Sequence, residues 1–189
     1  MTVIKIKSAI LLLISGILLS CAIKYIPVET GGVRVENDFA IVKTDEFVLV
    51  ISNKYWIKDP QNLTDYFTTF YVSIRNRTEK ELSVQASDFV LLDENGNQFD
   101  AVLPEQIFDL MLPKELGFDS LLDMTPEERQ TRENWQDAKN DLMYEAFHFG
   151  KIYPGAKKNG FVFFPRLKSE NKKCKIIFKG KEINFIREG

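Results

Sequence analysis

A two-residue alternation of apolar and polar side chains is the sequence feature that most constrains the fold. In residues 66–76, Phe70, Val72 and Ile74 alternate with more polar neighbours, which marks one buried face of a β-strand. The same period recurs in several short segments that are separated by turn signals. Because these segments do not alternate regularly with helical patterns, a parallel sheet is disfavoured. The pattern predicts a mainly β chain.

We expect roughly seven or eight strands from this spacing. They cover residues 33–43, 46–52, 66–76, 81–92, 98–102, 160–167, 173–179 and 182–187. Thr44-Asp45, Asn95-Gly96 and Gly180-Lys181 are the expected tight turns, and Asn-Gly is the strongest short-range hairpin signal among them. Short strands at this spacing predict two packed antiparallel sheets, that is, an immunoglobulin-like β-sandwich.

The apolar period changes to three and four residues in the middle of the chain. We expect a short helix over residues 104–112 and a long one over residues 126–149, with Thr125 as its N-cap and Gly150 at its end. The long helix has one apolar stripe, formed by Trp135, Ala138, Leu142, Ala146 and Phe149. The sequence therefore predicts a helical insertion, about residues 104–149, between two strands of the sandwich.

The first twenty residues have the features of a secretory signal peptide. Two lysines in residues 1–7 precede a mainly aliphatic run over residues 10–19. The order Leu18-Leu19-Ser20-Cys21 resembles the lipobox of bacterial lipoproteins, which implies that Cys21 carries diacylglycerol and begins the mature chain. An uncleaved anchor is disfavoured because the apolar run, about 15 residues, is shorter than the roughly 20 that a spanning helix needs. An ordinary secretory signal cut elsewhere remains an alternative.

The expected organisation is a signal peptide over residues 1–20, a lipidated Cys21 with a tether over residues 21–32, and one domain over residues 33–189. Eleven tether residues at about 3.4 Å each would hold the domain at most about 35 Å from the lipid. The partner expected first is therefore a membrane, through the lipid on Cys21, at the periplasmic face of the cell envelope. In the lipoproteins that this chain resembles, Asp after the Cys favours the inner membrane, so Ala22 favours the outer one.

Charge is distributed unevenly along the mature chain. Residues 22–149 contain 12 basic and 24 acidic residues, whereas residues 150–189 contain 11 basic and 3 acidic ones. Such a basic end could face anionic lipid or an acidic partner. We favour the alternative that late basic strands lie beside early acidic ones and that the two signs neutralise each other.

Three segments resemble a known group of domains. Residues 70–78, 87–96 and 154–165 are similar to segments of the immunoglobulin-like, telokin-like domains of bacterial lipoproteins of unassigned function. The first segment is a strand that ends in Asn, and the second is a strand followed by Asp, a turn and Gly. The third contains, in order, Pro-Gly, a spacer, Gly, an apolar strand and Pro. The resemblance skips the helical insertion. It implies a binding or scaffolding domain, and it brings no catalytic residue to this chain.

No residue pattern typical of catalysis is present, so we expect no enzyme activity, cofactor or metal site. His148 is the single histidine, which makes His-based metal clusters and a Ser-His-Asp arrangement improbable. Residues 93–100 superficially resemble a calcium loop, but their Gly is misplaced and the twelfth position is Pro104, so a hairpin turn is the better interpretation. Cys174 shares a strand face with Ile176 and Phe178, which favours a small buried hydrophobe over a reactive thiol.

The candidate binding residues are aromatic. Tyr55 and Trp56 in the loop over residues 53–65 could stack on sugars or anchor a partner if exposed, whereas a buried Trp56 would instead fill one end of the sandwich. Trp135 on the inserted helix is the third candidate. We expect non-covalent binding of another envelope protein through residues 104–149, with no nucleic-acid partner. The alternative is a glycan or small ligand bound by these aromatic residues.

Overall fold

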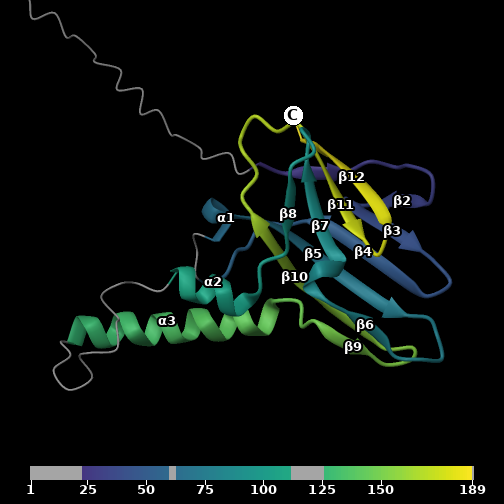
Figure 1. Cartoon of the computed structure of the whole chain (residues 1–189). Coiled ribbons are helices and arrows are strands. Elements are labelled where there is room, and N and C mark those ends of the chain that lie inside the picture. Colours follow the sequence, from purple (N-terminus) through teal and green to yellow (C-terminus); the bar gives the residue numbers. More distant parts are fainter. Residues whose placement is uncertain (1–22, 60–62, 112–125, 189) are drawn as a thin grey trace, which may run out of the picture.

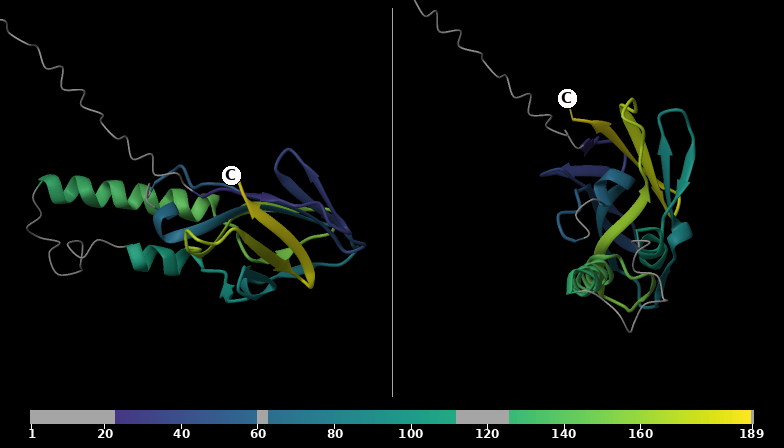
Figure 2. Two further views of the ribbon diagram at one scale, coloured as in Figure 1. Left: turned by 90° about the horizontal axis from the view of Figure 1, so that it is seen from above. Right: turned by 90° about the vertical axis from the view of Figure 1, so that its left-hand side faces the viewer.

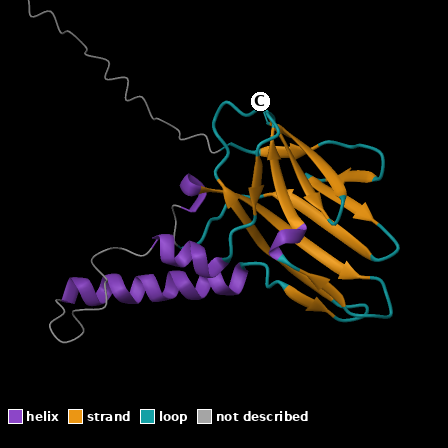
Figure 3. Cartoon of the chain, viewed as in Figure 1, coloured by secondary structure: helices purple, strands orange, loops and turns teal. Residues whose placement is uncertain are grey.

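The structure is a computed structural model that describes residues 23–59, 63–111 and 126–188. The predicted signal peptide, the lipidation site Cys21, Ala22 and the predicted N-cap Thr125 lie outside the described residues. In the described part the chain forms two five-stranded antiparallel sheets and one two-stranded sheet. The prediction of a mainly β sandwich is confirmed (Figures 1 and 3).

One sheet has the strand order β1-β12-β11-β7-β8 and the other has the order β10-β5-β4-β3-β2. The strands of the first sheet are β1 (Tyr25–Pro27), β12 (Lys181–Arg187), β11 (Lys173–Phe178), β7 (Phe89–Asp93) and β8 (Gln98–Asp100). The strands of the second sheet are β10 (Lys157–Pro165), β5 (Phe67–Asn76), β4 (Phe47–Asn53), β3 (Phe39–Lys43) and β2 (Val33–Glu36). The small sheet pairs β6 (Leu82–Val84) with β9 (Gly150–Ile152).

Helices occupy one end of the sandwich. The α-helices are α1 (Leu63–Tyr66), α2 (Pro104–Met111) and α3 (Pro126–Glu145), and Ala86–Asp88 forms a 3-10 turn, η1. α2 and α3 lie between β8 and β9 in the chain, as predicted, and together project away from the sheets (Figure 2). We call α2 and α3 the helical arm.

The long helix ends earlier than the sequence predicts. α3 ends at Glu145 rather than Phe149, so Phe149 is not part of its stripe, and Gly150 begins β9 instead of ending the helix. The physical reason is a competing partner, because Phe147 N–H donates to the Phe161 carbonyl at 2.8 Å and Ala146 forms a parallel bridge with Phe161. β10 thus takes over the backbone groups that would have continued the helix.

The predicted tether over residues 21–32 is wrong for its central part. Tyr25–Pro27 is strand β1, which pairs with β12, so the ordered domain begins well before Val33. Tyr25 is 2% exposed, its N–H donates to Asn53 Oδ1 at 2.8 Å and its hydroxyl donates to the Asn171 carbonyl at 3.1 Å. Burial raises the pKa of Tyr25 to about 12. This segment is therefore part of the fold.

The described residues contain twelve strands, more than predicted. Residues 33–43 form a hairpin rather than one strand, because Asn37 and Asp38 turn the chain with φ of 47° and 65°. Asn and Asp tolerate this left-handed conformation better than most residues. Residues 81–92 divide into β6, η1 and β7, and the last hairpin turns at Lys179-Gly180, one residue before the predicted position.

The main hydrophobic cluster lies between the two large sheets. Its aromatic members are almost fully buried and include Tyr25, Phe47, Phe70, Phe89, Phe147, Phe164, Phe178 and Phe185. Cys174 is 4% exposed in this cluster, beside Ile176 and Phe178, which confirms the prediction of a buried hydrophobe. Burial raises the pKa of the Cys174 thiol to about 12, so its reactive thiolate form is suppressed at neutral pH.

A second hydrophobic cluster is separate from the main one. It consists of Trp56, Leu63, Phe67, Ile107, Leu142, Ala146 and Phe163. Strand β10 contributes to both clusters, because Val162 and Phe164 belong to the main cluster while Phe163 belongs to the second, with Phe161 packed against it. Alternate side chains of a strand point to opposite faces, so the second cluster joins the helical arm to the outer face of β10.

Ion pairs connect the basic end of the chain to the acidic part. Lys151 contacts Glu81 at 2.6 Å and Lys179 contacts Asp88 at 3.0 Å. In each pair a basic residue from residues 150–189 contacts an acidic residue from residues 22–149. For these pairs, the prediction that the two signs neutralise each other in the fold is confirmed. The Lys151–Glu81 pair is exposed and contributes little to stability, whereas the Lys179–Asp88 pair is half-buried.

Candidate functional site

The aromatic residues that the sequence singles out do not form one binding surface. Trp56 is 3% exposed and packs in the second cluster, with its ring 5.3 Å from the Phe161 ring in an edge-to-face arrangement and 5.7 Å from the Phe163 ring. The hypothesis of an exposed Trp56 that stacks on a ligand is therefore wrong. Tyr55 is half-buried beside it and lines a pocket.

Trp135 has a packing role within the helical arm. Its ring lies 5.2 Å from the Phe108 ring of α2, and Lys139 Nζ lies 4.6 Å from the Phe108 ring centroid. Both contacts hold α2 against α3, so Trp135 is half-buried rather than presented to a ligand. The predicted apolar stripe is confirmed at Ala138 and Leu142, which are 3% and 1% exposed.

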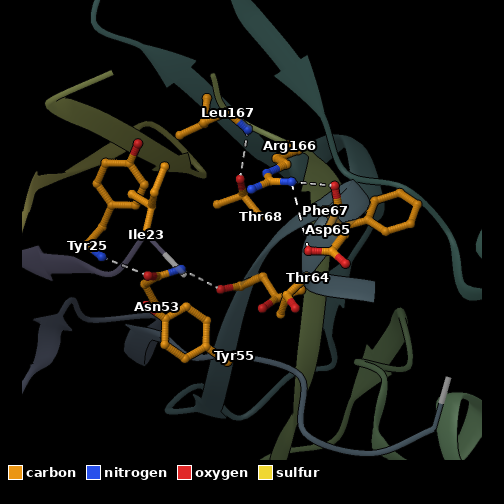
Figure 4. Close-up of a pocket in the computed structure, with 11 residues that line it drawn as sticks. Ile23, Tyr25, Asn53, Tyr55, Thr64, Asp65, Phe67, Thr68, Arg166 and Leu167 are labelled. Atoms are coloured by element: carbon orange, nitrogen blue, oxygen red, sulfur yellow. Dashed lines mark hydrogen bonds and ion pairs between the residues drawn. The ribbon is translucent and has the colours of Figure 1, made fainter. Parts of the chain in front are cut away.

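A pocket of about 180 Å³ opens at the end of the sandwich where the described chain begins. Figure 4 shows it between β1, the end of β4, α1 with the start of β5, and the chain after β10. Its lining includes Ile23, Tyr25, Asn53, Tyr55, Thr64, Asp65, Phe67, Thr68, Thr69, Arg166 and Leu167. Residues from both sheets meet here, which sequence patterns alone do not reveal.

Several inner polar groups of this pocket already have partners within the protein. Asn53 accepts from Tyr25 N–H and donates from Nδ2 to the Thr69 carbonyl at 2.8 Å, and the Thr68 hydroxyl accepts from Leu167 N–H at 2.9 Å (Figure 4). At the mouth, the Arg166 guanidinium donates to the Asp65 carbonyl at 2.8 Å. The inner polar groups are thus hydrogen-bonded within the protein, and the charged side chains of Arg166 and Asp65 are partly exposed.

The helical arm presents large apolar side chains to water. Leu110 on α2 is 73% exposed and Tyr144 on α3 is 82% exposed. The sequence did not single them out because neither lies on the apolar stripe of α3. Exposed aliphatic and aromatic side chains on a projecting element are typical of contact surfaces.

An acidic row runs along the face of α3 that carries Tyr144. It consists of Glu133, Asp137, Asp141 and Glu145 at a spacing of four residues. Like charges at this spacing are neighbours on one helix face and destabilise an isolated helix by roughly 0.2–0.5 kcal/mol per pair. Glu145 has a partner, since Lys58 Nζ lies 2.6 Å from its carboxylate. The other three carboxylates make this face of the arm acidic.

The loop that resembles a calcium site is a hairpin turn, as predicted. The Asp93 carboxylate accepts from the backbone N–H groups of Asn95 and Asn97 at 2.8 Å and from Asn97 Nδ2 at 2.7 Å. Burial alone would raise the pKa of Asp93, but these hydrogen bonds, that of the Asn97 side chain first, lower it below its usual value. Gly96 adopts the required positive φ of 83°.

The structure shows no grouping of catalytic type among the residues it describes. His148 is exposed and lies three residues beyond the end of α3. Within the same ranges no three His, Cys, Asp or Glu side chains lie close enough to hold a metal ion. Among these residues, no helix has the length and apolar character needed to cross a membrane.

No family model matches this chain, and no curated protein matches it. Its structure is similar to that of the yjhA protein from Bacillus subtilis, at 12% sequence identity over 73% of this chain and 76% of the other, with a TM-score of 0.40. It is also similar to a functionally unknown protein from Listeria monocytogenes EGD-e, at 10% identity over 82% of this chain and 70% of the other, with a TM-score of 0.33. Likenesses this distant carry no functional argument.

Proposed function

We propose that this chain is a lipid-anchored protein of the cell envelope that binds another protein through the helical arm. The anchor is diacylglycerol on Cys21, at the periplasmic face and in the outer membrane rather than the inner one. The chain acts by non-covalent binding, without catalysis and without a cofactor. The signal-peptide pattern and its lipobox-like end support the anchor.

The single observation that carries the binding proposal is the surface of the helical arm. Leu110 and Tyr144 are the most exposed large apolar residues of α2 and α3 among those described, and Tyr144 lies on the face of α3 that carries the acidic row. Apolar anchors bordered by charge are what a protein interface needs for affinity and orientation. The partner surface that fits is an apolar groove bordered by Lys or Arg.

A photo-crosslinking amino acid in place of Tyr144 tests this proposal in intact cells. The matched control is the same replacement of Tyr153, which is also exposed, at 63%, but lies outside the arm between β9 and β10. We expect a discrete crosslinked protein from position 144 that is absent from position 153. Equal crosslinking at both positions, or none at position 144, would contradict the proposal.

Charge reversal on the same face sharpens the test. Asp137→Lys with Asp141→Lys reverses the charge of the two central residues of the acidic row while leaving Leu110 and Tyr144 in place. We expect the position-144 crosslink to be lost, because opposite charges set the orientation of the partner. An undiminished crosslink would show that the row has no part in recognition.

A small polar ligand in the pocket is the second candidate function. The favouring observation is the cavity of about 180 Å³ with Tyr55 in its wall and Arg166 at its mouth. Trp56 adjoins Tyr55 in sequence, so its fluorescence in a Trp135→Phe variant reports binding there. Titration with soluble peptidoglycan fragments that leaves this fluorescence unchanged would count against the ligand.

A further inference from the structure

The spacer between the lipidation site and the folded domain is much shorter than the sequence suggests. Tyr25 is held in β1 by pairing with β12, and Ile23 packs against the main cluster and lines the pocket. Cys21 precedes Ile23 by two residues, so the two Cα atoms are at most about 7 Å apart. A lipid on Cys21 would therefore bring the surface around Ile23 against the bilayer, with little freedom to reorient.

Two strongly exposed apolar side chains lie on segments that adjoin the pocket residues in the chain. Ile57 is 88% exposed in the loop after β4, two residues beyond the pocket residue Tyr55 and directly before Lys58, which contacts Glu145 at the end of α3. Tyr66 is 56% exposed at the end of α1, and its carbonyl accepts from Arg166 N–H at 3.0 Å. Tyrosine is enriched where proteins meet the lipid headgroups, because its ring is apolar and its hydroxyl is polar.

Cationic side chains accompany them. The side chain of Arg166 is 47% exposed at the pocket mouth, and Lys168 is exposed two residues later in the same loop. Arg166 is oriented by donation to the Asp65 carbonyl, while its contact with the Asp65 carboxylate is long, at 4.0 Å. Guanidinium and ammonium groups close to a bilayer are attracted to phosphate groups of the lipids.

We propose that the end of the sandwich around Ile23 is a membrane-docking surface, on which Tyr66 and Ile57 insert among phospholipid headgroups while Arg166 and Lys168 contact their phosphates. This inference rests on the lipid anchor proposed above. With this docking surface, the end of the sandwich around Ile23 contacts the bilayer and the opposite end faces water. Strands β5 and β10 are antiparallel, so the start of one lies beside the end of the other (Figure 1). Tyr66 precedes β5 and Tyr153 precedes β10, so the two tyrosines lie at opposite ends of this strand pair.

The test uses the mature lipoprotein reconstituted into vesicles of phosphatidylethanolamine and phosphatidylglycerol. Tyr66→Cys and Tyr153→Cys form a matched pair for attaching one fluorophore, since the two tyrosines are similarly exposed. Cys174 is buried and its thiol pKa is raised to about 12, so an introduced exposed thiol reacts selectively. Lipids with a nitroxide near the headgroup then quench only fluorophores that lie at the bilayer surface.

We expect strong quenching at position 66 and none at position 153. Ile57→Cys provides a second reporter that leaves Tyr66 intact, and quenching is expected there too. Absence of quenching at both 57 and 66, or equal quenching at 153, overturns the docking surface. Intact-mass analysis of the same sample separates the two proposals, because acylated Cys21 with unquenched reporters refutes docking alone, whereas an unmodified Cys21 refutes the anchor and docking together.

Discussion

The two hydrophobic clusters meet on strand β10 but are built differently. The main cluster comes from alternating residues of paired strands, such as Phe70 in β5 and Phe185 in β12. The second cluster collects single residues from a loop, three helices and the outer face of β10, such as Trp56, Leu142 and Phe163. The sandwich therefore has its own core, and the helical arm is a layer that packs on its outside.

The two clusters also differ in whether the buried polar groups near them are hydrogen-bonded. Beside the main cluster, the buried side chains of Asn53, Asn76 and Asn171 all make hydrogen bonds. The indole N–H groups of Trp56, in the second cluster, and of Trp135, between α2 and α3, are buried and have no partner among the residues that the structure describes. A buried donor without a partner costs roughly 1–3 kcal/mol. The Trp56 donor therefore lowers the net stability that the second cluster contributes.

Truncation inside the main cluster should have the largest effect. Phe164→Ala leaves a cavity between the sheets, because Phe164 is fully buried and its ring packs edge-to-face on Phe70 at 6.0 Å. We expect the free energy of unfolding to fall by about 4 kcal/mol. Chemical denaturation followed by circular dichroism measures it, and a loss below about 1 kcal/mol would contradict the assignment of Phe164 to the core.

The neighbouring truncation should affect the arm more than the sheets. Phe163→Ala removes a ring that contacts Trp56 and Phe67 in the second cluster. We expect about 3 kcal/mol of destabilisation by the same cavity mechanism, confined to the arm. Limited proteolysis should cut within α2 or α3 in this variant and leave the sandwich intact. Simultaneous loss of both parts would show that the clusters form one cooperative unit.

An acidic pH should weaken the β7–β8 hairpin through Asp93. Because its pKa is lowered in the folded state, Asp93 contributes stability above its unfolded value of 3.8, and this contribution is lost as the pH falls through the folded pKa. We expect Asp93→Ala to cost about 1 kcal/mol at neutral pH. Denaturation curves of the variant and the original chain should converge below the folded pKa. A constant difference down to the lowest pH would contradict this linkage.

The smallest effect should come from removing an unpaired donor. Trp56→Phe deletes an indole N–H that has no partner among the described residues, but keeps an aromatic ring against Phe161 and Phe163. Loss of packing lowers the free energy of unfolding, whereas removal of a buried donor without a partner raises it. We therefore expect a net change in the free energy of unfolding below about 1 kcal/mol. Thermal unfolding measures it. A loss comparable to that of Phe163→Ala would mean that the donor has a partner in solution.

Local sequence signals predicted the main architecture because they act over a few residues. The alternation of residues 66–76 became β5, and Asn95-Gly96 turned the β7–β8 hairpin. The helical insertion was found from the period of its apolar residues. The turn at Asn37-Asp38 was missed because this pair, unlike Asn-Gly, needs positive φ at two residues that both carry a Cβ.

The remaining features depend on contacts between distant residues. β1 pairs with β12 across nearly the whole chain, so no local pattern distinguished it from a tether. Gly160 was read as a strand boundary, but it lies within β10 where a Cβ would approach backbone atoms of Ala146 and Phe147 at 2.6 Å. This close approach also ends α3. The pocket, with Arg166 at its mouth, likewise exists only once both sheets are assembled.

Amide hydrogen exchange of the intact chain tests most directly whether the helical arm is a separate layer. We expect that amides of residues 138–145 in α3 are protected, but open with a lower free energy than those of β7 and β11 in the main sheet. Unprotected amides across α3 would contradict the second cluster. Equal opening free energies in α3 and the sheet would contradict its independence from the main core.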